Sequence, residues 1–104
     1  MRTATVFVHG HLAGHLDELE PGRKYRFIYR SGYDGPAVSL TMPTSASEYM
    51  SDRFPPFFEG LLPEGVMLEG LLKQNKIDRL DYFSQLVTVG GDLVGAVTVQ
   101  EVAE

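Results

Sequence analysis

Residues 54–65 read FPPFFEGLLPEG, and the character of the chain changes at this stretch. Large apolar residues are mixed there with prolines and glycines, which punctuate regular structure. Pro56 can sit in the first turn of a short helix, and Pro63 can open a second helix, because the N–H that proline lacks is not needed there. The stretch therefore predicts that two helices begin within it, whereas the sequence before it has the pattern of strands.

Upstream of this stretch, alternating apolar residues predict strands. The clearest case is KYRFIYR at residues 24–30, in which Tyr25, Phe27 and Tyr29 share one face. His9-Gly10 predicts a two-residue hairpin turn, because glycine adopts positive φ freely and histidine can tolerate it. The expected strands are residues 3–8, 11–16, 24–30 and 37–42, and the expected loops are residues 17–22, 31–36 and 44–53.

Downstream, apolar residues recur at helical spacing from Pro63 onward, which predicts a second helix. Gly65 and Gly70 each cost such a helix about 1 kcal/mol relative to alanine, so we expect tertiary packing to support it. A third helix is expected over residues 82–87, with Asp78 or Asp81 as its N-cap and Gly90-Gly91 after its end. Residues 93–102 close the chain as a strand that pairs back into the early sheet.

Strands that come first and helices that come later indicate an α+β fold rather than a wound α/β sheet. The 104 residues are expected to form one domain, residues 1–104. No run reaches the roughly 20 apolar residues of a membrane span, and no signal peptide is visible. With no cysteine in the chain, these features predict a small cytoplasmic domain that has no membrane partner.

The charge balance bears on nucleic-acid binding. A net charge of -5 disfavours direct contact with nucleic acid, since neutralising phosphates needs clustered Lys and Arg. Basic residues do interleave with the aromatic residues of the 24–30 strand, as in a base-stacking strand. A basic strand with an aromatic core face gives the same pattern, and the overall acidity favours that interpretation.

Catalytic and metal-binding motifs are not recognisable. His9, His11 and His15 are more typical of exposed turn and edge positions than of a metal site, which usually needs three or four ligands. Glu59 and Glu64 are five residues apart, a spacing that does not bring them to one helical face. The chain has neither a phosphate-binding loop nor a nucleophile elbow. We therefore expect a non-enzyme without catalytic residues, metal or cofactor.

Four segments, taken in order, resemble proteins of the HipA family. They are VFVHGHLAG at residues 6–14, PAVSLTMP at 36–43, PPFFEGLLPEG at 55–65 and GGDLVGAV at 90–97. The eleven-residue segment is a close match to a specific signature of the family, and the four together span nearly the whole chain. The resemblance implies the N-terminal subdomain of HipA, with a small antiparallel β-barrel-like sheet of about five strands, two or three short helices and a closing C-terminal strand.

In the family this subdomain precedes a serine/threonine kinase body, whose motifs are not found here. A free-standing copy is similar to the HipS-type antitoxins of HipBST toxin–antitoxin systems. The resemblance therefore implies an antitoxin that neutralises a HipT-type kinase by supplying the missing subdomain in trans, alongside a HipB-type DNA-binding protein in a ternary complex. The alternative is a nucleic-acid-binding accessory protein of a toxin–antitoxin operon.

The end of the signature, together with the two residues after it, is the expected contact with the partner. The predicted partner-binding residues are Leu62, Pro63, Glu64, Gly65, Val66 and Met67. Many relatives carry tryptophan directly after LLPEG, where this chain has the smaller Val66; the flexible Met67 can compensate in part. Phe57, Phe58 and Leu61, just before, suit either a corner of the core or exposed anchors on a proline-braced segment.

Overall fold

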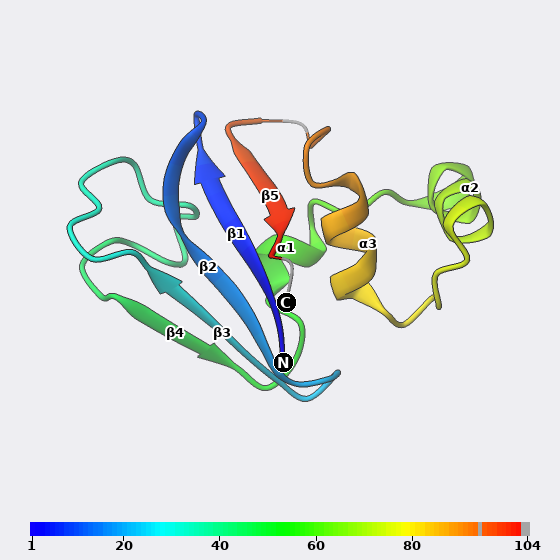
Figure 1. Cartoon of the computed structure of the whole chain (residues 1–104), viewed down its shortest axis with the longest axis horizontal. Coiled ribbons are helices and arrows are strands. Elements are labelled where there is room, and N and C mark those ends of the chain that lie inside the picture. Colours follow the sequence, from blue (N-terminus) through cyan, green and yellow to red (C-terminus); the bar gives the residue numbers. More distant parts are fainter. Residues whose placement is uncertain (94, 103–104) are drawn as a thin grey trace.

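The computed structural model describes residues 1–93 and 95–102, and its elements come in the order expected for an α+β fold (Figure 1). The elements are β1 (Arg2–Val8), β2 (His11–Glu20), β3 (Lys24–Tyr29), β4 (Glu48–Ser51), α1 (Pro56–Glu59), α2 (Gly65–Asn75), α3 (Tyr82–Val89) and β5 (Val97–Glu101). The described strands form one antiparallel sheet in the order β4-β3-β2-β1-β5. The sheet is open at β4 and β5 rather than closed into a barrel.

The first hairpin is formed as predicted. His9 and Gly10 adopt φ values of 50° and 79°, which suit the tight turn between β1 and β2. Val6 and Val8 lie on the buried face of β1. The closing strand also pairs with β1 as expected, although β5 begins at Val97; of the residues predicted for that strand, Val94 lies outside the described part of the chain.

The prediction of an acidic loop over residues 17–22 is wrong, because β2 continues to Glu20. Asp17 and Glu18 are buried in the sheet, where arginines on neighbouring strands neutralise them. Arg26 Nη2 lies 2.8 Å from Asp17 Oδ2, and Arg2 Nε lies 2.7 Å from Glu18 Oε1. Burial of these acids therefore depends on cross-strand partners that local sequence does not reveal.

Residues 44–53 are not the continuous exposed loop that was predicted. Glu48–Ser51 form β4, a short edge strand paired with β3. Its four residues are half-buried or exposed, so the strand lacks the buried apolar face that would mark it in the sequence. The strong alternation of β3, by contrast, is confirmed, with Tyr25, Phe27 and Tyr29 all buried.

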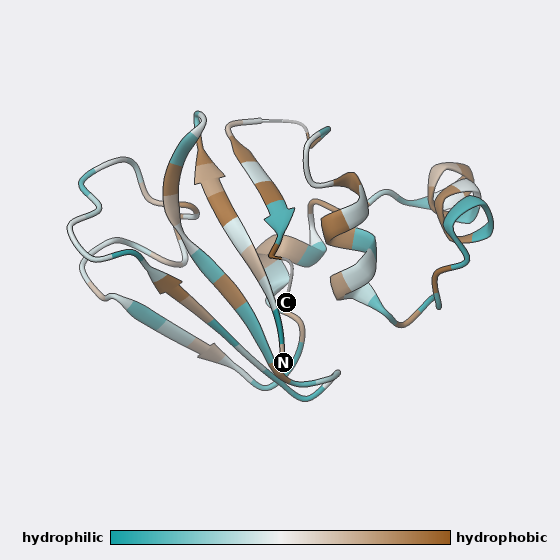
Figure 2. Ribbon diagram, viewed as in Figure 1, coloured by the Kyte–Doolittle hydropathy of each residue, from teal (hydrophilic) through white to brown (hydrophobic). Residues whose placement is uncertain are grey.

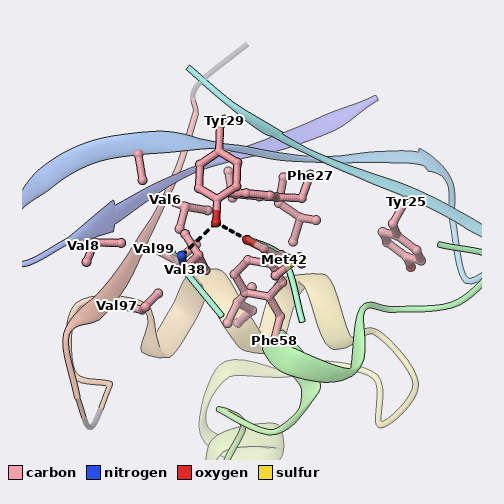
Figure 3. Packing of buried hydrophobic residues seen from close by; sticks show 14 of the residues in the cluster. Val6, Val8, Tyr25, Phe27, Tyr29, Val38, Met42, Phe58, Val97 and Val99 are labelled. Carbon is pink, nitrogen blue, oxygen red and sulfur yellow. Dashed lines mark hydrogen bonds between the residues drawn. The ribbon is translucent and has the colours of Figure 1, made fainter. Parts of the chain in front are cut away.

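The prediction of a strand over residues 37–42 is also wrong. Only a single bridge joins Ser39 and Met42 there. The hydroxyl of Tyr29 fixes this segment instead, since it accepts from the Val38 N–H at 2.9 Å and donates to the Met42 carbonyl at 2.5 Å (Figure 3). Val38 and Met42 are consequently buried, whereas Leu40 between them is fully exposed.

The core lies between the sheet and the helices α1 and α3. Figure 3 shows Phe27 and Tyr29 of β3 on the side of the sheet where Phe58 of α1 lies, and Figure 2 shows the apolar residues of the strands and of α3. Phe58 is fully buried, with its ring centroid 5.9 Å from that of Phe27. Phe57 and Leu61 are partly buried and pack against the same core. The signature segment therefore forms a corner of the core at these three positions.

An ionic cluster fixes the start of α3 to the first strand. Asp81, rather than Asp78, is the N-cap of α3, and its side chain accepts from the Ser84 N–H at 3.1 Å. Arg2 of β1 bridges the two elements, because Nη2 lies 2.9 Å from Asp81 Oδ1 while the same guanidinium also binds Glu18. The cluster therefore joins β1, β2 and α3, and α3 itself runs two residues beyond the predicted end, to Val89.

This cluster predicts a loss of stability in acid. Burial alone would raise the pKa of Asp81, but hydrogen bonds from Arg2 and Ser84 lower it below the ordinary value. A lowered folded-state pKa stabilises the protein above the unfolded pKa, about 3.9, and this contribution is lost as pH falls through the folded value. We expect Asp81→Asn, which keeps a good N-cap, to lower the free energy of unfolding by about 1 kcal/mol at pH 7.

Urea unfolding at several pH values measures this contribution. The difference between the natural protein and Asp81→Asn should stay constant from neutral pH to about pH 5 and shrink below about pH 4. A difference that persisted unchanged into strong acid would show that the ionised carboxylate contributes nothing.

Candidate partner-binding site

The helix α2 stands apart from the sheet and from the other helices (Figure 1). Within it only Leu72 is buried, while the side chains of Val66 and Met67 are 89% and 75% exposed. The expectation that tertiary packing supports this helix is therefore wrong for most of its length. Large apolar side chains presented to water on one helix are a common sign of a binding surface.

The start of α2 differs from the prediction. The helix begins at Gly65, with Glu64 as its N-cap, so Pro63 precedes the helix instead of opening it. Gly65 has a φ of 58°, in the left-handed region where only glycine is free of strain. The turn stands directly before Val66 and Met67, which are both exposed.

A groove lies between the segment that leads into α2 and the connection from α3 to β5. It has a volume of about 490 Å³ and contains four of the predicted partner-binding residues: Leu62, Pro63, Glu64 and Met67. Leu62 and Pro63 are half-buried in its wall, whereas Glu64 is exposed. Gly65 and Val66 are both exposed and do not line the groove. The structure thus divides the predicted residues between a groove and a protruding helix start.

The opposite wall of the groove was missed by sequence reasoning. It is formed by Val89 at the end of α3 and by Asp92 and Leu93 in the following connection. The only sequence signal there is the GGDLVGAV segment at residues 90–97, which carries part of the family resemblance but has no pattern typical of a binding site. These residues meet the α1–α2 segment only through tertiary folding.

The charged residues of the groove are both acidic. Glu64 and Asp92 are exposed, and neither forms an ion pair within residues 1–93 and 95–102. The remaining lining is Gly60 and the apolar residues Leu61, Leu62, Pro63, Met67, Val89 and Leu93. The groove therefore combines apolar walls with unneutralised negative charge.

The other candidate sites have structural explanations. The aromatic residues of β3 face the core, so they do not offer a surface for base stacking. Arg26 of that strand pairs with Asp17, and Arg30 donates to the carbonyls of Leu12 and Ser31. The interpretation of residues 24–30 as a basic strand with an aromatic core face is confirmed.

The histidines lie around the first hairpin, where His9 and His11 are exposed and His15 is half-buried. His15 Nε2 lies 3.5 Å from Asp17 Oδ2, a carboxylate that is already paired with Arg26. In the described part of the chain, no group of three or more histidine, cysteine or acidic residues is arranged to hold a metal ion. Nor does any helix there combine the length and apolarity that crossing a bilayer requires.

Comparison with known sequences decides the family. The sequence model of the HipA N-terminal domain matches residues 4–100. The chain belongs to the HipA N-terminal domain family. The solved N-terminal domain of HipA toxin has 30% sequence identity and a TM-score of 0.78, over 100% of this chain and 95% of that one. An uncharacterized protein of Haemophilus influenzae is 35% identical over 101 residues, or 97% of this chain and 93% of its own.

The family membership confirms the resemblance and associates this HipA N-terminal domain with toxin–antitoxin proteins. Its signature segment, residues 55–65, forms α1 and continues to the first residue of α2. One half of the signature thus supplies Phe58 to the core, and the other half supplies Leu62, Pro63 and Glu64 to the groove.

Proposed function

We propose that this HipA N-terminal domain is an antitoxin that binds a HipT-type serine/threonine kinase in the cytoplasm and neutralises it. In this proposal residues 1–104 act as one docking domain that supplies its subdomain to the kinase in trans. A HipB-type DNA-binding protein would complete a ternary complex and make the contacts with DNA. The observation that carries the proposal is the exposure of Val66 and Met67 at the start of a helix that the rest of the fold leaves largely unpacked.

Burial of these two side chains against a partner would contribute favourably to the free energy of binding. Covering a side chain of this kind contributes about 1.5–3 kcal/mol, and a few such anchors supply most of the binding energy in protein complexes. Docking would also stabilise α2, since a helix of 11 residues is marginal in water without packing. Gly70 in its interior weakens it further. A partner surface would provide the contacts that the fold does not.

The contact is tested by placing a charge at its most exposed apolar residue. We expect Val66→Asp to weaken the complex with the HipT-type kinase by about 2 kcal/mol, or roughly 30-fold in Kd, because a carboxylate would be buried without a partner. Titration calorimetry with the purified kinase measures the change. The same variant should lose part of its ability to relieve growth arrest when it is co-expressed with the kinase.

Leu40→Asp is the matched control, because Leu40 is fully exposed on a loop outside the groove and α2. It should bind the kinase as the natural protein does. Equal affinity of the natural protein, Val66→Asp and Leu40→Asp for the kinase would show that the contact does not include the start of α2. No complex with the natural protein, together with undiminished growth arrest, would contradict the antitoxin function itself.

A further inference from the structure

We propose that the groove beside α2 holds a basic side chain, arginine or lysine, contributed by the docked partner. This inference rests on the proposed function and extends it, because it states which chemistry the kinase must present next to the anchor at Val66. It is carried by the coincidence of apolar walls and two unpaired carboxylates in one groove.

The walls fit the aliphatic part of such a side chain. Leu62 and Met67 stand on the α2 side, and Val89 and Leu93 stand on the opposite side. The carbon stem of arginine or lysine packs along apolar surface of this kind while its charged head stays at the polar edge. The volume of about 490 Å³ leaves room for a complete side chain and part of its backbone.

The two carboxylates are not needed by the fold. Glu64 stands at the N-cap of α2, but its side chain makes no capping hydrogen bond. Asp92 contributes its backbone N–H to a turn with the Val89 carbonyl at 2.8 Å, and its carboxylate has no ion pair in the described part of the chain. By contrast, Asp17 and Glu18 are each neutralised by an arginine of the same fold. The two buried acids of the sheet are therefore neutralised within the fold, whereas the two exposed carboxylates of the groove remain free to bind a cation.

The same charges disfavour a purely apolar occupant. An aromatic or aliphatic side chain would cover the groove and take water away from Glu64 and Asp92, with no hydrogen bond in return, which is costly for a charged group. A guanidinium or ammonium group replaces that water with charge-assisted hydrogen bonds. Charge complementarity therefore selects a basic residue over an apolar one of similar length.

The first experiment tests the groove without the kinase. The probes are N-acetyl-arginine amide and N-acetyl-norleucine amide, which have stems of comparable length but differ in charge. We expect the arginine amide, at millimolar concentration, to shift the NMR methyl signals of Leu62, Met67 and Leu93, and the norleucine amide to leave them nearly unchanged. Equal shifts with both probes, or no shift with arginine amide, would overturn the inference.

The carboxylates are tested by neutral, isosteric replacement. The double variant Glu64→Gln/Asp92→Asn should lose the response to arginine amide. The matched control Asp34→Asn/Asp52→Asn removes the same amount of charge from exposed positions outside the groove and should keep the response. If both double variants behaved alike, the effect would come from net charge, and the groove would have no special role.

The second experiment uses the complex with the kinase. At low salt we expect Glu64→Gln/Asp92→Asn to bind the kinase about tenfold more weakly than the control does, and to show a flatter dependence of affinity on salt. If Val66→Asp weakens the complex but Glu64→Gln/Asp92→Asn does not, the docking function stands and the basic anchor is overturned. If arginine amide binds as expected but the kinase does not bind at all, the proposed function fails while the groove keeps its ligand chemistry.

Discussion

Replacing Phe58 with alanine should lower the free energy of unfolding by about 3–5 kcal/mol, because it removes a ring from the centre of the core. Phe58 has no exposed surface, and its ring packs against Phe27 of β3 and Phe57 of its own helix. The neighbouring positions belong to a strand and to a proline-braced helix, so they cannot easily close the cavity. A domain of this size has a total stability of about 5–15 kcal/mol, and the variant should be near the limit of folding.

Chemical denaturation followed by far-UV circular dichroism measures this loss. Leu40→Ala is the control, since Leu40 is fully exposed and its truncation should change the stability by no more than about 0.5 kcal/mol. A loss of less than about 1 kcal/mol for Phe58→Ala would mean that α1 is not fixed against the sheet as described.

Replacing Gly90 with alanine should cost about 3 kcal/mol, for a reason of space and not of backbone conformation. A Cβ atom at Gly90 would lie 2.0 Å from the carbonyl oxygen of Val99, far inside contact distance. Gly90 has helical dihedral angles, so alanine would otherwise suit the position. The Gly90 carbonyl also accepts from the Val99 N–H at 2.9 Å, so the clash acts on the contact between α3 and β5.

The adjacent glycine provides the matched control. A Cβ atom at Gly91 would meet nothing within 4 Å, so Gly91→Ala should change the stability by no more than about 0.5 kcal/mol. Thermal unfolding of the two variants side by side separates close packing from general effects of alanine in this turn. Equal losses would show that the approach of α3 to β5 does not limit the choice of residue at Gly90.

Elements with a strong local signal were predictable from the sequence. The turn at His9-Gly10, the alternation in β3, the proline at the start of α1 and the cap at Asp81 each depend on residues close together in the chain. The errors concern segments whose conformation is set by distant partners. β2 extends through Asp17, which pairs with β1 and β3 and is neutralised by Arg26. Residues 37–42 are held by the Tyr29 hydroxyl instead of by strand pairing.

The candidate site, too, could be predicted only where the signal lies in neighbouring residues of the chain. The signature segment and the two residues after it led us to expect Leu62, Pro63, Glu64 and Met67 at a surface, and the structure shows these four residues lining a groove. The facing residues, from Val89 to Leu93, come from an element that packs there only in the folded protein, and no local pattern marks them. The exposure of α2 could not be predicted either, because its apolar spacing is equally typical of a helix packed on a core.

The position of β5 affects how the protein can be made. β1 pairs on one side with β2, which follows it at once, and on the other side with β5, which comes after all the other described elements in the chain. Until β5 leaves the ribosome, β1 is an unprotected sheet edge, and such edges are prone to pair with other chains. Gly90 at the end of α3 also lacks its contact with Val99 until then. The sheet can therefore be completed only after β5 has been synthesised, and a nascent chain stalled before residue 97 would be exposed to aggregation.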